Sequence, residues 1–360
     1  MTATASATLT NSLTAGRLDK RAPWLILLAT LVVSFVVVGL IGAATDPEGA
    51  FNIVAAVFFG VLLYVVTIGV VSRLVEGSRR STDRVVTAVV SLAFVVALLP
   101  LISLVFTVIT MGSGRIDLDF FTLSMRNVLG EGGGAAHAIV GTLLMTGVAT
   151  IISVPIGLMA SIYLVEYGRG RLAQAITFFV DVMTGIPSIV AGLFAFALFE
   201  LILGPGQRVG LSGAIALTVL MIPVVVRSSE EMLRLVPNEL REASFALGVP
   251  KWLTIVKVVL PTSIAGITTG IMLSIARVIG ETAPLLIAAG FSNNFNFDLT
   301  SDRMQSLPVF VYYSYVSQGT DFQPYIDRAW AGALTLIAIV MILNLGARLI
   351  ARIFAPKLGR

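Results

Sequence analysis

Long stretches without a charged residue are the feature that most limits how this chain can fold. A helix needs about 20 apolar residues to cross the hydrocarbon layer of a membrane. Six charge-free segments reach or approach that length: 22–45, 49–72, 85–114, 132–165, 209–226 and 329–346. Two further apolar segments, 172–203 and 263–291, do so with two charged residues each. The sequence therefore predicts an all-α integral membrane protein, built as a helical bundle of about eight transmembrane spans.

The composition agrees with a membrane protein and excludes several functions. Of the 360 residues 57% are hydrophobic and 12% are charged, and a soluble protein carries about twice that charged fraction. There is no cysteine and one histidine, His137, so we expect neither a thiol nucleophile nor a metal site or cofactor. The net charge of +4 comes from basic residues between the apolar segments, which indicates membrane topology and not nucleic-acid binding.

The distribution of these basic residues predicts the orientation of the chain, because cytoplasmic loops hold the excess of Lys and Arg. They gather in every second connection and at both ends, within residues 17–21, 73–84, 169–171, 227–257 and 348–360. The first connection instead carries Asp46 and Glu48. We therefore expect both termini in the cytoplasm, with tails at 1–21 and 354–360. The first apolar run is longer than the core of a secretory signal, so we interpret it as a span.

One connection differs from the others in composition. The segment 239–261, "ELREASFALGVPKWLTIVKVVLP", combines charged and small residues with one glycine and two prolines. Asn238 can cap a helix that Gly248 then ends, and Pro250 can open a second short helix. Pro261 would mark the turn into the seventh span. The pattern predicts a helix–turn–helix on the membrane surface that offers small residues for docking, although an ordinary amphipathic connector fits the spacing equally well.

Ionisable residues inside the spans are candidate functional residues, because each costs about 2.5–3.5 kcal/mol at the centre of a membrane helix. Arg277 and Glu281 are four residues apart in the seventh span, so they would share a helical face and could pair. Such a pair could simply fix the packing of helices. Alternatively, it could line a path for an anion, because the planar guanidinium matches an oxyanion.

Two further residues extend this candidate path. Arg227 follows the sixth span, where it could be an interfacial anchor or a second cation nearer the cytoplasm. Asp181 lies in the fifth span beside Gly185 and Pro187, which predict a broken helix. Asp181 could equally be the structural partner of an arginine or a gate.

The unusual connection resembles the "EAA…G…I-x-L-P" loop of ABC importer permeases, with Ser in place of the second Ala and Val in place of Ile. In that family the loop docks on the cytoplasmic ATPase and transmits its movement to the membrane helices. The resemblance implies this coupling role for Glu242, Ala243, Ser244, Gly248, Leu260 and Pro261.

A narrower resemblance is carried by "VDVMTGIPSIVAGLF", "IPVVVRSSEEMLRLVPNELREASFALGVPKW" and "SIARVIGETAPLL". These stretches are similar to the PstA-type permeases of phosphate-specific ABC importers in the bacterial cytoplasmic membrane. The resemblance implies a six-span type I permease core at 85–353 and a role in transport for Arg227 and Arg277. It also implies inorganic phosphate as substrate, a PstB-type ATPase dimer, a PstC-type second permease and an external PstS-type binding protein. The two spans within 22–84 depart from this pattern.

The chain contains no G-x-x-x-x-G-K-[ST] loop for nucleotide phosphates, so we expect a transport subunit and not an enzyme, with ATP hydrolysed by another subunit. Alternatives remain open at this stage. They are a permease for sulfate, molybdate or another small oxyanion, the PstC-type partner, a secondary transporter or channel, and a subunit that senses phosphate in the same assembly.

Overall fold

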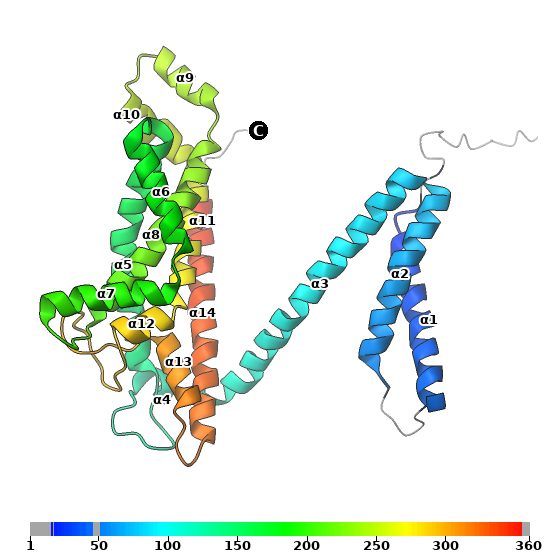
Figure 1. Cartoon of the computed structure of the whole chain (residues 1–360), viewed down its shortest axis with the longest axis horizontal. Helices are drawn as coiled ribbons and strands as arrows, with labels where there is room; N and C mark the ends of the chain where they lie inside the picture. Colours follow the sequence, from blue (N-terminus) through cyan, green and yellow to red (C-terminus); the bar gives the residue numbers. More distant parts are fainter. Residues whose placement is uncertain (1–15, 17, 46–50, 355–360) are drawn as a thin grey trace, which may run out of the picture. The chain divides into compact units, whose positions relative to one another are not determined.

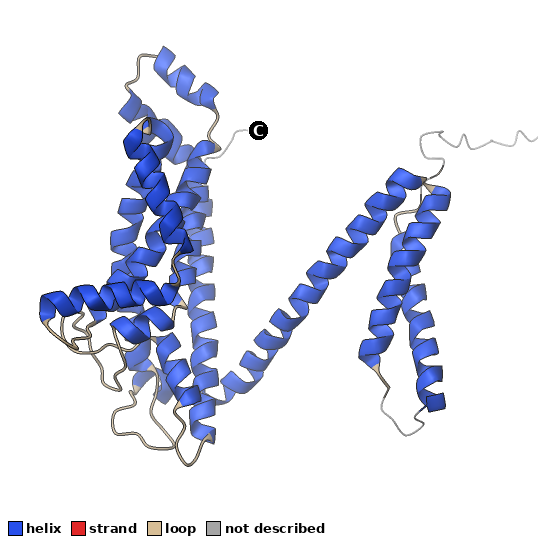
Figure 2. Cartoon of the chain, in the orientation of Figure 1, coloured by secondary structure: helices blue, strands red, loops and turns tan. Residues whose placement is uncertain are grey.

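The computed structural model describes residues 16, 18–45 and 51–354, and every regular element within them is a helix (Figure 2). Seven of these helices are long and apolar enough to cross a membrane, and one bent pair of helices supplies an eighth candidate span. The prediction of an all-α membrane protein is therefore confirmed. Most of the two predicted tails, 1–21 and 354–360, lies outside the described residues.

The chain forms two compact units, Met1–Leu104 and Val105–Arg360. The division falls inside one long helix, α3 (Ser78–Gly112), after the end of the 22–84 segment. In the first unit α1 (Ala22–Thr45) and α2 (Ile53–Val75) pack as a hairpin (Figure 1). Their close approach requires a small residue, because a Cβ on Gly60 would lie 2.8 Å from Leu31 Cδ2.

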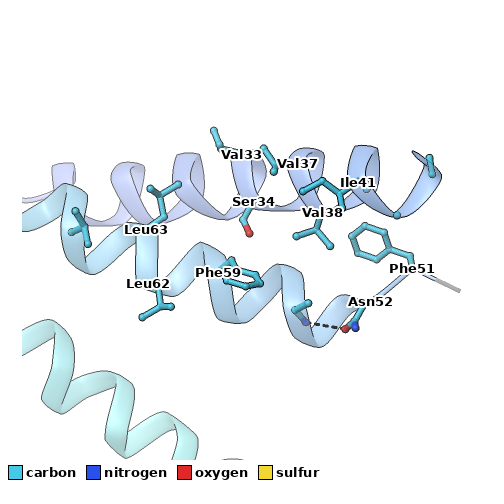
Figure 3. Close-up of a pocket in the computed structure, with 15 residues that line it drawn as sticks. Val33, Ser34, Val37, Val38, Ile41, Phe51, Asn52, Phe59, Leu62 and Leu63 are labelled. Atoms are coloured by element: carbon cyan, nitrogen blue, oxygen red, sulfur yellow. Dashed lines mark hydrogen bonds between the residues drawn. The ribbon is translucent and has the colours of Figure 1, made fainter. Parts of the chain in front are cut away.

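A groove of about 920 Å³ runs along this hairpin (Figure 3). Its lining is apolar apart from Ser34 and Asn52, and it contains no ionisable side chain. Both polar groups are used within the fold, because Ser34 Oγ donates to Ala56 O at 2.7 Å and Asn52 caps α2. The groove therefore has no charged group that could select an anionic solute.

The second unit is built around α8 (Gly210–Arg234), most of whose residues are buried. A stretch of α5 (Ala136–Ile162) packs on it where a Cβ on Gly157 would lie 2.7 Å from Val225. The other long helices of the unit are α6 (Arg171–Gly185), α7 (Ser188–Leu203), α11 (Leu260–Ile279) and α14 (Gln323–Phe354). Shorter elements are η1 (Ser113–Arg115), α4 (Leu118–Thr122), α9 (Asn238–Ala246), α10 (Lys251–Thr254), α12 (Ala283–Ala288) and α13 (Leu307–Val316).

Two glycines, four residues apart, join α11 to α8. A Cβ on Gly266 would meet the side chain of Met232, and one on Gly270 would lie 2.6 Å from Ser228 Cβ. Small residues at this spacing let two membrane helices approach at backbone distance, where packing and not water exclusion drives association. Movement of α8 is therefore expected to carry α11 with it.

The fifth predicted span is a bent pair, because α6 and α7 meet at 108°. Pro187, at φ −58° and ψ 136°, directs the chain out of the helical conformation directly after Gly185 and Ile186. The break was predicted from Gly185 and Pro187, and the helix α7 then runs across the bundle (Figure 1). It packs on α12, where a Cβ on Gly192 would lie 2.6 Å from Pro284 Cα.

Candidate functional site

Four charged side chains form a continuous network on α6 and α8. Arg227 Nη2 contacts the carboxylate of Asp181, and Arg227 Nη1 donates to Glu230 Oε2 at 2.8 Å. The other oxygen of Glu230 accepts from Arg234 Nη2 at 2.6 Å. The Glu230 side chain is only 7% exposed, so two guanidinium groups compensate one buried carboxylate.

The position of Arg227 corrects one prediction. The sixth span does not end at Val226, because α8 continues to Arg234. Residues 227, 230 and 234 are three and four positions apart, a spacing that stabilises a helix through ion pairs. At 1.5 Å per residue, Arg227 therefore lies about 10 Å inside the end of its helix.

Asp181 serves as the structural partner of an arginine, one of its two predicted roles. It joins α6 to α8 through Arg227. The contact is open to its surroundings, since the Asp181 side chain is 59% exposed and that of Arg227 is 34% exposed. An anion could therefore compete with Asp181 for this guanidinium.

The predicted pairing of Arg277 with Glu281 is wrong for this chain. The helix α11 ends at Ile279, and Glu281 N donates to Val278 O at 3.2 Å in the turn that follows. The two residues therefore do not share a helical face, and no ion pair joins them in the described part of the chain. The span expected at 263–291 ends early because Gly280 caps α11 and a separate helix, α12, begins at Ala283 with Pro284 in its first turn.

Arg277 lies on the outward face of α11. Leu273 and Gly280, four residues before and three after it, are exposed, while Ile275 and Val278 are buried in the core. Within residues 16, 18–45 and 51–354, no carboxylate forms an ion pair with Arg277. The chain thus presents an arginine from the last turn of α11, which carries no other charged residue.

The segment 239–261 folds as the predicted helix–turn–helix, with α9 and α10 at one end of the core (Figure 1). Gly248 adopts φ +75°. Its N–H donates to Phe245 O at 2.9 Å, and Val249 N donates to Ser244 O at 3.2 Å. These two bonds form a Schellman motif, in which glycine has the least strain.

Two details of this segment differ from prediction. Pro237 and not Asn238 occupies the N-cap of α9, and the Asn238 side chain accepts from Arg241 at 3.3 Å. No turn occurs at Pro261, because the helix is continuous over Lys251–Ile279. A π-helical turn, η3 (Ile255–Val259), precedes the proline, which lacks an N–H and would strain a regular α-helix there.

The predicted coupling residues divide into two groups. Glu242, Ala243, Gly248 and Pro261 are exposed, and Leu260 is half-buried. Ser244 is buried, and its hydroxyl lies 2.8 Å from Thr254 Oγ1, so it holds α9 against α10. Large apolar side chains accompany the exposed group, including Phe245, Leu247 and Trp252 at 43%, 83% and 61% exposure.

Two residues that fix this segment were not predicted from the sequence. Arg241, on α9, donates to Glu166 Oε1 from Nε at 3.0 Å and from Nη2 at 2.8 Å. Glu166 belongs to η2 (Tyr163–Tyr167), a π-helical turn that continues α5. A contact between residues 75 positions apart leaves no local sequence signal. In contrast, the spacing of Arg227, Glu230 and Arg234 was available in the sequence.

Comparison with known proteins agrees with this architecture. Residues 153–360 match the family described as binding-protein-dependent transport system inner membrane component. A solved bacterial alginate ABC transporter, in complex with an alginate pentasaccharide-bound periplasmic protein, has a chain of the same fold at a TM-score of 0.54. The match covers 80% of this chain and 100% of that one, at 14% identity.

Curated relatives are more similar in sequence. The phosphate transport system permease protein PstA 1 of Mycobacterium tuberculosis (strain CDC 1551 / Oshkosh) is 49% identical over 275 residues, which cover 76% of this chain and 89% of the relative. The phosphate transport system permease protein PstA of Yersinia pestis is 40% identical over 280 residues, which cover 78% and 92%. The chain therefore belongs to the family of PstA permeases, inner-membrane components of binding-protein-dependent transport systems.

Proposed function

We propose that this chain is the permease subunit of an ATP-driven importer of inorganic phosphate and forms half of the translocation path. The substrate is supported by relatives that are 40–49% identical and are named phosphate transport permeases. One observation of this structure carries the anion path: Arg277 projects from an apolar spanning helix without a carboxylate partner among the described residues.

An arginine in this position needs a polar environment. A charge that faces lipid costs up to about 2.5–3.5 kcal/mol on insertion scales, with the highest cost at the membrane centre, so the exposed face of α11 is expected to meet another subunit or a water-filled path. A guanidinium binds a phosphate through two parallel hydrogen bonds and keeps its charge throughout. Arg227 is then the second cation of the path, Asp181 competes with the anion for it, and Glu281 lies beside the outer end of α11.

The segment with α9 and α10 is the docking surface for an ATPase dimer of the PstB type, at the cytoplasmic side of the membrane. Its exposed surface combines Glu242, Ala243 and Gly248 with apolar side chains that a soluble partner can bury. Closure of the ATPase dimer on ATP would move this segment and switch the path from one side of the membrane to the other. We call residues 239–261 the coupling segment from here on.

The proposed importer has two further subunits. A PstC-type permease forms the other half of the path, and a PstS-type protein delivers phosphate from outside. The termini lie in the cytoplasm with the coupling segment. The two N-terminal spans within 22–84 are an addition to a six-span permease core at 85–353, and the apolar groove on their hairpin has no feature of the phosphate path.

Uptake of labelled phosphate at low micromolar concentration tests the proposal, in cells that lack this chain and in cells in which it is restored. Sulfate and molybdate are offered in excess as competitors. Restored uptake that neither competitor reduces supports phosphate import. Strong competition by another oxyanion would contradict phosphate as substrate. Uptake that persists without ATP would instead indicate a secondary transporter or channel.

A further inference from the structure

One arginine of the coupling segment, Arg241, uses all three guanidinium nitrogens to bind groups of the core. Besides its two bonds to Glu166, Arg241 donates from Nη1 to Val236 O at 2.6 Å and from Nη2 to Leu233 O at 3.0 Å. The Arg241 side chain is 13% exposed and that of Glu166 is 6% exposed. One guanidinium therefore connects α9, the end of α8 and the end of α5.

A second contact joins the same elements. Lys251, the first residue of α10, donates its Nζ proton to Glu166 O and lies 4.8 Å from the centre of the Tyr167 ring. Both short helices of the coupling segment are thus attached to η2, the turn that ends the α5 span. Apart from these contacts, α9 reaches the preceding span through the backbone at 235–237 and, by way of its Ser244 contact with α10, through the apolar cluster that Val259 shares with Leu233.

The local backbone suits this attachment. The described residues contain two π-helical stretches: η2, which contacts the coupling segment through Glu166, and η3, which is part of that segment. A π-helical turn inserts one extra residue into a helix and changes the direction of the side chains, which is why such turns occur often at functional sites. In η2 the turn carries Glu166, whose carboxylate meets Arg241.

We propose that Glu166 and Arg241 form a clamp that makes α5 and α8 follow the coupling segment when the ATPase moves it. The inference rests on the proposed function and names positioning residues that work in it. The spans adjacent in sequence to the coupling segment are α8 and α11, but the clamp adds α5, which is remote in sequence. Because Met145 and Ala149 of α5 share a buried core with Leu217 and Met221 of α8, the two helices respond as one body.

This route leads to the charged residues of the path. The helix α8 carries Arg227 two turns from the clamped end, and Gly266 and Gly270 hold α11, which carries Arg277, against α8. A displacement of α9 would therefore reach both arginines through packed helices. If the clamp were absent, part of the displacement would be lost as a change in the 235–237 connection.

The test uses the complete importer in lipid vesicles and measures phosphate imported per ATP hydrolysed. Glu166→Gln removes one charge of the clamp at similar side-chain volume, and Arg241→Gln removes the other charge with a shorter side chain. We expect assembly and ATP hydrolysis to persist while the transport ratio falls about tenfold, which corresponds to a lost coupling of about 1.4 kcal/mol. The double variant should be no worse than Arg241→Gln, because that variant already removes the interaction with Glu166.

Arg171→Gln is the matched control, because Arg171 is an exposed arginine at the start of α6 outside the coupling segment. Its transport ratio should equal that of the unaltered protein. If the two clamp variants assemble poorly, Arg241→Lys replaces them, because the ammonium keeps the charge but cannot form the two guanidinium bonds to Glu166 Oε1. We then expect a smaller fall in the same ratio, and an unchanged ratio would overturn the proposal.

A second measurement follows α5 directly. The chain has no cysteine, so Ile151→Cys, at a 73% exposed position of α5, accepts a single spin label when the other subunits are free of cysteine. ATP binding should change the mobility of this label, measured from its EPR line shape, when the clamp is unaltered, and should leave the mobility unchanged in Glu166→Gln. Movement that persists in Glu166→Gln, or a normal transport ratio in the assembled clamp variants, would overturn the clamp. Absence of phosphate import by the unaltered importer would instead contradict the proposed function.

Discussion

Two arginine–carboxylate contacts of the core differ in their exposure to solvent. We call the buried one closed and the exposed one open. Arg241 is 13% exposed and Glu166 is 6% exposed, and the guanidinium also binds two backbone carbonyls. Arg227 and Asp181 are 34% and 59% exposed, so solvent or a solute can reach both. The closed contact has no free site for an anion and is suited to holding elements together. The open contact can exchange its carboxylate for a passing anion.

Arg277 lies at the far end of this comparison, because it is exposed and has no ion pair in the described part of the chain. Arg277→Gln should reduce phosphate uptake to background while the subunits still assemble, since nothing else in α11 replaces the charge. Arg277→Lys should retain a small part of the uptake, because the ammonium keeps the charge without the planar fork. Initial rates of labelled phosphate uptake and co-purification of the subunits measure both. Normal uptake by Arg277→Gln would remove Arg277 from the path.

The turn of the coupling segment should give the next largest effect. Gly248 has φ +75°, where an L-residue costs about 1–2 kcal/mol. Gly248→Asp adds this strain and a charge on the docking surface, so ATP hydrolysis should continue while uptake falls about tenfold. A tenfold fall corresponds to about 1.4 kcal/mol of lost docking energy. Nothing lies within 4 Å of a Cβ at this position, so Gly248→Ala isolates the backbone strain and should give a smaller loss. Coupled ATPase and uptake assays decide, and unimpaired ATP-driven uptake by Gly248→Asp would contradict the coupling assignment.

The sequence predicted those parts of the fold that depend on local pattern. Apolar length located the spans, and Gly185 with Pro187 predicted the break between α6 and α7. The helix–turn–helix at Gly248 also followed from local residues, because a left-handed glycine ends a helix whatever packs against it. These features require no knowledge of contacts distant in the sequence.

The site was less predictable because its contacts are distant in the sequence. Asp181 and Arg227 are 46 positions apart and Glu166 and Arg241 are 75 apart, so only the folded core brings each pair together. The expected pair of Arg277 and Glu281 assumed a helix that continues, but α11 ends between the two residues. Spacing of four residues predicts a contact only where the helix persists.

Asp181→Asn tests the open contact and should have a moderate effect. The variant keeps the size of the side chain and removes the carboxylate that competes for Arg227, while Glu230 still holds Nη1. We expect a KM for phosphate that falls about threefold to tenfold and a maximal rate that also falls, because the anion is held more tightly and released more slowly. Uptake measured over a range of phosphate concentrations separates the two parameters. An unchanged KM would show that Asp181 does not compete with the substrate.

The smallest effect on transport is expected at a closed contact outside the core. In the first unit Glu76 is 2% exposed and accepts hydrogen bonds from Arg84, Ser72 and the N–H of Leu18. Burial alone would raise the pKa of Glu76, but the hydrogen bonds from Arg84, Ser72 and Leu18 lower it to about 2. Because the folded-state pKa is depressed, the stabilisation is fully present above the ordinary value of 4.5 and is lost as the pH falls toward about 2.

Glu76→Gln should therefore loosen the junction of α1, α2 and α3 at every pH, whereas the unaltered protein should loosen only below about pH 4.5. Hydrogen exchange of residues 72–84 at pH 6 and at pH 3, corrected for the intrinsic dependence of exchange on pH, measures this. Phosphate uptake at neutral pH should change less than about twofold, because Leu18, Ser72 and Arg84, the hydrogen-bond partners of Glu76, all belong to the first unit. A large loss of uptake with normal assembly would show that the first unit takes part in transport. A small loss of uptake would show that a buried ion pair affects transport only where it joins elements that move together. The Glu76 contact stabilises the first unit, whereas the clamp joins the coupling segment to the helices that it moves.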